Sequence, residues 1–293
     1  MKRIICFGEV LWDVFPSQKR IGGAPLNVAV RLRSFGHQVC LVSRIGKDED
    51  GTEICRFLKD ADIGTVHLQK DSVYKTGSVS ISLDNEGSAS YSIDFPSAWD
   101  YIAYNKKIDM ELSLADAFIY GSLAARNNTT QKTLLQLLEK ATFKVFAVNL
   151  RAPYYTKELL LTLMKKADFI KFNEEELKEV TSYMGFSHPD VKENIRFLSK
   201  KTNTSQICVT KGKHGAVFLF NNQIYSHEGY KIGVVDTVGA GDSFLASLIH
   251  CLLDGKKPEY ALDYASAVGA LVAGSKGANP EVSLEDINFF RSQ

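Results

Sequence analysis

Short apolar runs alternate with helical patterns along most of the chain, and this alternation limits the possible folds more than any other feature. The runs are rich in β-branched and aromatic residues, as expected of strands that are buried on both faces. The expected strands are Ile4–Phe7, Val39–Val42, Ala117–Tyr120, Val145–Leu150, Phe169–Phe172, Ile207–Thr210 and Val217–Phe220. The expected helices between them are Pro25–Phe35, Gly51–Asp60, Thr130–Lys140, Lys157–Lys166, Glu174–Thr181 and Val191–Lys200. This order predicts an α/β fold of three layers, with a mainly parallel sheet flanked by helices.

The part of the chain after Gly239 has a helical pattern to its end. Two long helices are expected there, over Asp242–Leu253 and Pro258–Val272, and each has one strongly apolar face. The first of them follows a glycine-rich turn directly.

Two segments interrupt the strand–helix rhythm and predict a small antiparallel flap standing off the main sheet. Residues 10–20 continue beyond the first strand with large apolar residues set among polar ones. Residues 76–94 read as a hairpin, in which apolar residues alternate with serine and aspartate around an expected turn at Asp84–Gly87. We expect these two segments to form a lid over the site.

The composition favours a cytoplasmic globular protein. The formal net charge is +1, so no strong field attracts nucleic acid or an anionic membrane surface. The five cysteines are scattered and form no CxxC pair, which suits a reducing compartment. Glu9 and Asp13 interrupt the first apolar run too early for a signal peptide, and no apolar stretch is long enough to span a bilayer. Without a repeat or a linker-like tract, residues 1–293 are expected to form a single domain.

The segment Asp236–Phe244 places glycines directly before a helix. Glycine allows the backbone to approach a ligand closely, and the first turn of a helix offers unpaired N–H groups to a phosphate. Asp242 within such an anion site is suited to act as a general base toward an attacking hydroxyl, while the amides of Ala240 and Gly241 hold a phosphoryl group. The alternative is an aspartate that only caps the helix after a flexible turn.

A second glycine pair, Gly22–Gly23, also opens a helix, with Pro25 near its first turn. Asn27 could offer both a donor and an acceptor to a polyol. The alternative is a left-handed turn followed by a buried asparagine. The chain has neither a P-loop nor a G-x-G-x-x-G fingerprint, so these two segments are its candidate phosphate and substrate sites.

Taken together, GGAPLNVA and DTVGAGDSF resemble the two signature regions of the ribokinase-like (PfkB) sugar kinases, and the resemblance covers essentially the whole chain. Within the family, the segments GEVLWDVFP and NLRAPYY most resemble those of bacterial fructokinases. Further segments match in the family's order: Gly8–Asp13, Arg44–Asp48, Gly121–Ala124, Asn149–Arg151, Asn173–Glu176, Thr210–Gly212 and Gly277–Ala278.

The resemblance implies a role for each matching residue, with ATP, Mg²⁺ and K⁺ as cofactors. Asp242 is similar to the catalytic base, and Gly239, Ala240 and Gly241 look like the anion hole. Sugar hydroxyls are expected to bind Asp13, Gly23, Asn27 and Arg151. The nucleotide pocket is expected to include Asn173, Thr210, Gly212, Gly277 and Asn279, within or near the stretch 275–279. Asn173 and Glu176 resemble the element that positions Mg²⁺ and phosphate through water, and the potassium site resembles Asp236, Val238, Ser275 and Gly277.

One departure from the family's pattern concerns magnesium. Ala147 stands where related kinases often carry an aspartate that supports the magnesium environment. Asp242 and its glycines are intact, so the sequence still predicts an active kinase.

The expected reaction is ATP-dependent phosphorylation of a free sugar, D-fructose to fructose 6-phosphate. Ribose, 2-keto-3-deoxygluconate or a nucleoside are alternative acceptors, and a non-catalytic sugar-binding regulator is the alternative from another class. A phosphorylated sugar is disfavoured because only Lys19 and Arg20 lie near Asp13 in the sequence. The expected partners are a sugar and ATP, with a homodimer through the lid as a further expectation. Trp99 and Tyr101 could stack on a sugar or pack the hinge of the flap, and Arg126 is expected at the surface.

Overall fold

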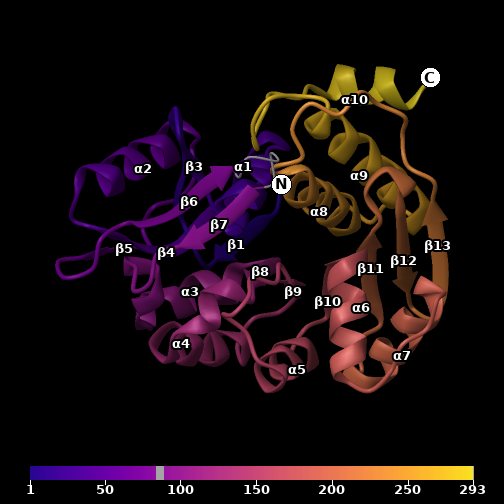
Figure 1. Ribbon diagram of the computed structural model, residues 1–293, viewed down its shortest axis with the longest axis horizontal. Coiled ribbons are helices and arrows are strands. Elements are labelled where there is room, and N and C mark those ends of the chain that lie inside the picture. The colour runs from indigo at the N-terminus through magenta and orange to yellow at the C-terminus, as the bar shows by residue number, and fades with distance from the viewer. Residues whose placement is uncertain (84–88, 293) are drawn as a thin grey trace.

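The computed structural model of the chain describes residues 1–83 and 89–292, and a nine-stranded sheet forms its centre (Figure 1). Neighbouring strands from β5 to β11 run parallel, and β12 and β13 continue the sheet in antiparallel fashion. The spatial order is β5 (Leu68–Asp71), β4 (Gln38–Gly46), β1 (Arg3–Phe7), β8 (Ala117–Gly121), β9 (Lys144–Ala147), β10 (Phe169–Asn173), β11 (Gln206–Thr210), β12 (Ala216–Phe220) and β13 (Gln223–His227).

Successive strand residues point to opposite sides of the sheet, and both sides are apolar here. Helices therefore cover both faces. In β1, Ile4 and Cys6 enter one apolar core, while Ile5 and Phe7 enter the other. The first core is covered by α1 (Ala24–Ser34), α2 (Glu49–Asp60), α8 (Ala240–Leu253) and α9 (Pro258–Ala273). The second core is covered by α3 (Lys106–Leu114), α4 (Asn128–Leu138), α5 (Lys157–Lys165), α6 (Glu174–Tyr183) and α7 (Val191–Thr202). The predicted three-layer α/β fold is confirmed.

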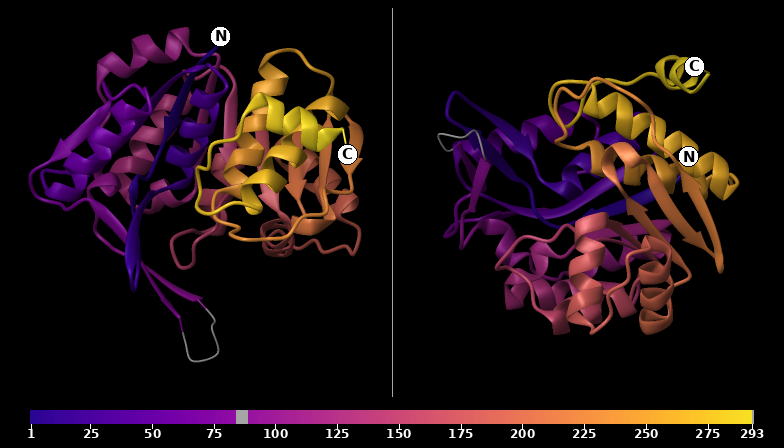
Figure 2. Two further views of the ribbon diagram at one scale, coloured as in Figure 1. Left: turned by 90° about the horizontal axis from the view of Figure 1, so that it is seen from above. Right: turned by 45° about the vertical axis from the view of Figure 1, so that its right-hand side comes forward.

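A separate sheet of four strands stands off the main body, where the two irregular segments were expected (Figure 2, left). Its order is β3 (Gln18–Gly22), β2 (Leu11–Phe15), β6 (Gly77–Leu83) and β7 (Ala89–Ile93). Strands β6 and β7 form the predicted antiparallel hairpin, with Val79 opposite Ile93. The expectation of an antiparallel flap was wrong for the pairing of β2 with β6, which is parallel because the chain reaches β6 by a long connection through the main sheet. The expected turn at Asp84–Gly87 lies outside the described residues. We call this four-stranded sheet the lid sheet.

Backbone conformation explains two of the differences between the predicted and the observed segments. The expected strand Val145–Leu150 ends at Ala147, because Asn149 has a left-handed backbone (φ 45°) that cannot continue a strand. The C-terminal region is not helical throughout. A loop separates α9 from α10 (Leu284–Arg291), and it contains Gly277 in a left-handed conformation (φ 80°) and Pro280.

Some elements, among them β5, β13 and α3, went unpredicted because their sequence patterns are weak. Strands β5 and β13 are short and only partly buried, and α3 buries only Ile108 and Leu112. Among the described residues, no helix combines the length and apolar character needed to cross a bilayer.

Candidate active site

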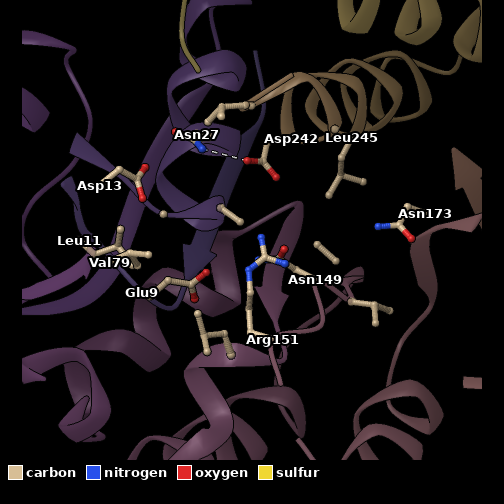
Figure 3. A pocket seen from close by; sticks show the side chains of 18 of the residues that line it. Glu9, Leu11, Asp13, Asn27, Val79, Asn149, Arg151, Asn173, Asp242 and Leu245 are labelled. Carbon is tan, nitrogen blue, oxygen red and sulfur yellow. Dashed lines mark hydrogen bonds between the residues drawn. The ribbon is translucent and has the colours of Figure 1, made fainter. Parts of the chain in front are cut away.

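The largest group of predicted site residues lines one cavity of about 540 Å³ (Figure 3). The cavity lies at the carboxyl ends of the parallel strands, where ligands of open α/β sheets usually bind. The lid sheet contributes Leu11, Phe15, Val79 and Ile93 to one wall. The predicted residues that line the cavity are Asp13, Gly23, Asn27, Arg151, Asn173, Glu176, Val238, Gly239, Gly241 and Asp242.

Asp242 stands in the first turn of the fourteen-residue helix α8 and lines the cavity. Its Oδ2 accepts a hydrogen bond of 2.9 Å from Asn27 Nδ2, and Figure 3 shows the other oxygen turned toward the cavity. Burial raises the pKa of Asp242 above the usual range of an aspartate, while Asn27, Lys171 and Arg151 oppose this shift. The carboxylate is therefore held in one orientation and is poised to accept a proton.

The backbone before α8 forms a turn that only glycine fits. Gly239 has a left-handed conformation (φ 77°), and a Cβ at this position would lie 2.4 Å from the carbonyl oxygen of Ala278. The turn brings Gly239 and Gly241 to the cavity wall at the positive end of the helix dipole, whereas the Ala240 amide donates to the Thr237 carbonyl oxygen at 3.3 Å. This arrangement can hold a phosphoryl group.

Asp13, on strand β2, and Gly23, before α1, form the part of the cavity next to the lid sheet. Burial raises the pKa of Asp13 to about 6, although the charges of Arg151 and Arg20 lower it. Gly23 has φ 114°, and a Cβ there would meet the carbonyl oxygen of Glu9 at 2.6 Å. These groups offer carboxylate, amide and guanidinium partners to a polyol.

Asn173 and Glu176 cap helix α6 reciprocally. Asn173 Oδ1 accepts from the Glu176 amide at 2.8 Å, and Glu176 Oε2 accepts from the Asn173 amide at 2.8 Å. Glu176 Oε1 also accepts from the Leu150 amide at 3.1 Å. Both carboxylate oxygens already accept an N–H, so this pair fits a magnesium ion held through water rather than by direct ligation, as Mg²⁺ often is beside nucleotide phosphates.

Asp236 joins the two loops of the expected potassium site. Its Oδ1 accepts from the Val238 amide at 3.0 Å, and its Oδ2 accepts from the Gly277 amide at 3.1 Å. Arg20, from strand β3 of the lid sheet, reaches the same Oδ2 with Nη1 at 3.4 Å. Both Asp236 oxygens therefore accept N–H groups in this structure, and Arg20 places a positive charge beside them.

A model of the pfkB family of carbohydrate kinases matches residues 2–285. The chain belongs to this family. Within it, the chain is 27% identical to the fructokinase of Escherichia coli over 306 residues, covering 94% of each protein. The structure of a fructokinase with bound ATP from Xylella fastidiosa shares the fold with a TM-score of 0.88 at 23% identity, covering 99% of this chain and 98% of that one. A Vibrio cholerae fructokinase double mutant in its fructose, ADP and potassium bound form gives a TM-score of 0.84 at 23% identity, with the same coverage.

Other predicted residues of this carbohydrate kinase lie outside the cavity lining. These are Thr210, Gly212, Asp236, Ala240, Ser275, Gly277 and Asn279. Thr210 ends strand β11 directly opposite Asn173 in the register. Asn279 donates to Asn27 Oδ1 at 2.9 Å, so in this structure it supports the asparagine that holds Asp242.

Two charged residues that line the kinase's cavity received no role in the sequence analysis. Glu9 is buried, and its Oε2 has no hydrogen-bond partner among the described residues. Burial raises the pKa of Glu9 to about 7, and Asp242 adds to this shift. Lys171 interrupts the apolar strand β10 with a charge. A charge within an apolar strand was the sequence signal that Lys171 could face a cavity. For Glu9 the only signal was its place in a segment that matches the family.

The expectation that Arg126 lies at the surface was wrong. Its side chain is 1% exposed and pairs with the fully buried Asp100, through Nε to Oδ1 at 2.6 Å and Nη2 to Oδ2 at 2.8 Å. The guanidinium also stacks over the Trp99 ring at 3.9 Å. Trp99 is fully buried and Tyr101 stacks on Tyr74, so both pack beside the lid sheet rather than line the cavity.

Proposed function

We propose that this carbohydrate kinase transfers the γ-phosphoryl group of ATP to the 6-hydroxyl of D-fructose. One observation carries the proposal. The Asp242 carboxylate lines the cavity, is held by Asn27 and stands in the first turn of α8. A base and an anion site that share one helical turn are suited to moving a proton and a phosphoryl group in the same step.

In the proposed reaction, Asp242 takes the proton of the sugar hydroxyl as its oxygen attacks the γ-phosphorus. The new O–P bond forms while the bond between the β–γ bridging oxygen and the γ-phosphorus breaks, and ADP leaves. The amides of Ala240 and Gly241 stabilise the charge on the transferring group. A bound Mg²⁺ would neutralise phosphate charge, and Asn173 with Glu176 would hold its water shell.

The lid sheet is proposed to close over the sugar and exclude water, so that ATP is not hydrolysed in its place. Its apolar side chains Phe15, Val79 and Ile93 line the wall that faces the bound sugar in this proposal. The lid sheet is also the proposed surface for a homodimer. The five free cysteines suit the cytoplasm as the proposed location.

A free ketohexose is the proposed acceptor. Leu11, Glu9 and Asp13 offer apolar and carboxyl groups to a neutral polyol, and Arg151 and Lys171 supply the positive charge of the lining. The similarity to fructokinases over almost the whole chain supports fructose. The potassium named for the Vibrio cholerae structure supports a potassium role for Asp236, Val238, Ser275 and Gly277. Thr210, Gly212, Gly277 and Asn279 are proposed to lie beside the nucleotide.

A coupled assay of ADP formation tests the function. The purified protein is given ATP, Mg²⁺ and one acceptor at a time: fructose, ribose, 2-keto-3-deoxygluconate or a nucleoside, each with and without potassium. We expect the highest kcat/KM with fructose and a higher rate with potassium. If another acceptor gives a higher kcat/KM, that acceptor replaces fructose as the proposed substrate. If no acceptor leads to ADP formation, the result supports a non-catalytic sugar-binding regulator.

A further inference from the structure

The Arg126 guanidinium lies where strand β7 of the lid sheet returns to the main body. Its Nη2 donates to the carbonyl oxygen of Asp94, the residue directly after β7, at 2.5 Å. The guanidinium carbon lies 3.9 Å from the centre of the Trp99 ring, 4.6 Å from that of Tyr154 and 5.0 Å from that of Phe95. We call Arg126 and these three rings the aromatic clamp. A guanidinium is attracted to ring faces most strongly where water is excluded, as it is around the 1% exposed Arg126 side chain.

The aromatic clamp is fixed to the main body by Asp100. The Asp100 carboxylate is fully buried and accepts from both Nε and Nη2 of Arg126. It also accepts from the Ser97 amide at 2.8 Å, so the same carboxylate holds the short 3₁₀ turn Ala98–Tyr101 that follows the lid hairpin. A buried bidentate ion pair is costly to break, because separation leaves an uncompensated charge. The aromatic clamp is therefore a rigid anchor for the end of β7.

Tyr154 belongs to the aromatic clamp and also to the loop that carries Arg151. Its hydroxyl donates to the carbonyl oxygen of Ile93, the last residue of β7, at 3.1 Å. Its amide donates to the carbonyl oxygen of Arg151 at 2.8 Å, which closes a tight turn. Ile93 and Arg151 both line the cavity, and Figure 3 shows the Arg151 side chain directed into it. One tyrosine therefore connects an apolar wall residue of the lid sheet with a cation of the site.

The other end of this loop is held by the main body. The Leu150 amide donates to Glu176 Oε1 at 3.1 Å, and the Ser122 hydroxyl donates to the carbonyl oxygen of Val148 at 2.6 Å. Among the described residues, the Arg151 guanidinium forms no ion pair within 4 Å and donates only to the carbonyl oxygen of its neighbour Leu150, at 2.8 Å. No other side chain fixes the guanidinium there, so its position depends on the backbone of the loop.

We propose that Tyr154 is a positioning residue that couples the docking of the lid sheet to the placement of Arg151 against the sugar. The proposal rests on the proposed function, in which Arg151 contacts sugar hydroxyls beneath the lid sheet. Tyr154 does not line the cavity itself, so it acts through Ile93 and Arg151. While its hydroxyl holds β7, the apolar wall and the guanidinium keep one spacing. A site preorganised in this way loses less conformational freedom on binding and binds its ligand more tightly.

The alternative is that the Tyr154 hydroxyl only adds stability. Tyr154→Phe removes the hydroxyl and keeps the ring against the Arg126 guanidinium. Tyr120→Phe is the matched control, because the Tyr120 hydroxyl also donates to a carbonyl oxygen, that of Leu163 at 3.0 Å, and Tyr120 lies outside the cavity lining. Urea unfolding of both variants shows that each is folded and how much stability each hydroxyl contributes.

The first measurement is amide hydrogen exchange of the full chain without sugar. For Tyr154→Phe we expect exchange to become several-fold faster both in residues 89–94 and in residues 149–155, because releasing β7 also releases the loop. In Tyr120→Phe both segments should exchange at the rate of the unaltered protein. Faster exchange in only one of the two segments, or in neither, would overturn the coupling. This comparison needs no acceptor, so its outcome does not depend on the proposed function.

The second measurement uses the acceptor that gives the highest rate with the unaltered enzyme. We expect Tyr154→Phe to raise the KM for the sugar about five-fold, the scale of one hydrogen bond, and to leave the KM for ATP within about two-fold. When Arg151→Gln is already present, Tyr154→Phe should raise the KM by less than about two-fold further, because the residue through which it acts is gone. A KM for the sugar no higher than that of Tyr120→Phe, or a full five-fold increase beside Arg151→Gln, would leave Tyr154 with a structural role only.

Discussion

Asn27 and Asp242 lie 215 positions apart in the sequence and are joined by a hydrogen bond of 2.9 Å from Nδ2 to Oδ2. Asn279 extends this series of hydrogen bonds by donating to Asn27 Oδ1 at 2.9 Å. Three segments of the protein therefore fix the orientation of one carboxylate. The proposed catalysis depends on that orientation.

Replacing Asp242 by asparagine should lower kcat by roughly 10²–10⁴-fold while ATP binding persists, because the amide keeps the shape and loses the base. Steady-state kinetics and nucleotide titration measure the two effects. Asp254→Asn is the control, since Asp254 follows the last turn of the same helix, far from the cavity lining. A near-normal rate in the Asp242 variant would rule out its role as base.

The pH dependence of kcat/KM should show an acid limb above the range of an ordinary aspartate. The reacting form of Asp242 is the carboxylate, and its pKa is raised by burial, so the rate should fall as the pH drops through that raised value. Asn27→Ala removes a hydrogen bond that lowers this pKa, so its acid limb should move to still higher pH. An acid limb that moves down in the variant would contradict this assignment.

Asp13→Ala should raise the KM for the sugar by about ten-fold or more and leave the KM for ATP within about two-fold, the loss expected when one charged hydrogen bond disappears. Asp13 lies on strand β2 of the lid sheet and lines the cavity from that side. Initial rates with each substrate varied in turn give both constants. Equal increases for sugar and ATP would argue against contact with the sugar.

Arg20→Gln should lower the potassium concentration needed for half-maximal activity by several-fold. The Arg20 guanidinium shares Asp236 Oδ2 with the expected cation site, and its charge repels a cation there at these distances. The activity is measured over a potassium series at constant ionic strength. If the potassium requirement is unchanged or increases, Arg20 does not compete with the ion.

Arg126→Met should destabilise the protein by about 3–5 kcal/mol, because it leaves the fully buried Asp100 carboxylate without its partner. Urea unfolding measures the change. Arg33→Met is the control, since its partner Asp62 is 80% exposed and surface ion pairs contribute about 0–1 kcal/mol. Equal losses of unfolding free energy in the two variants would show that the buried Arg126–Asp100 pair contributes no more than a surface ion pair.

The sequence was sufficient for the layers of the fold and for the two glycine turns, because both have strong local signals. Phe169–Phe172 is apolar enough to be read as a strand from four residues. The burial of the Arg126 side chain had no such local signal. Its partner Asp100 and the Trp99 ring are 26 and 27 positions away, and only the packing of two 3₁₀ turns, Ala98–Tyr101 and Leu123–Arg126, brings them together.

The site was predictable to the extent that it consists of glycines and their neighbours. Asp242 and Asn27 follow such turns, and both line the cavity. Lys171 is different, because a lysine within a strand could face solvent or a ligand, and the choice depends on which face α8 covers. Glu9 is buried with an unpaired Oε2 among the described residues, and the charges of Arg151 and Asp242 reach it from distant segments, which no local pattern encodes.

The contact between Gly239 and Ala278 has a consequence for synthesis of the protein. The turn before α8 is shaped against a loop that lies 39 positions later, and a Cβ at 239 would collide with that loop. During translation, the turn before α8 therefore cannot reach its final form until the segment around Ala278 has left the ribosome. A polypeptide stalled after α8 would contain Asp242 but would lack the loop around Ala278 that packs against the Gly239 turn. Enzymatic turnover would therefore report that this loop has folded into place.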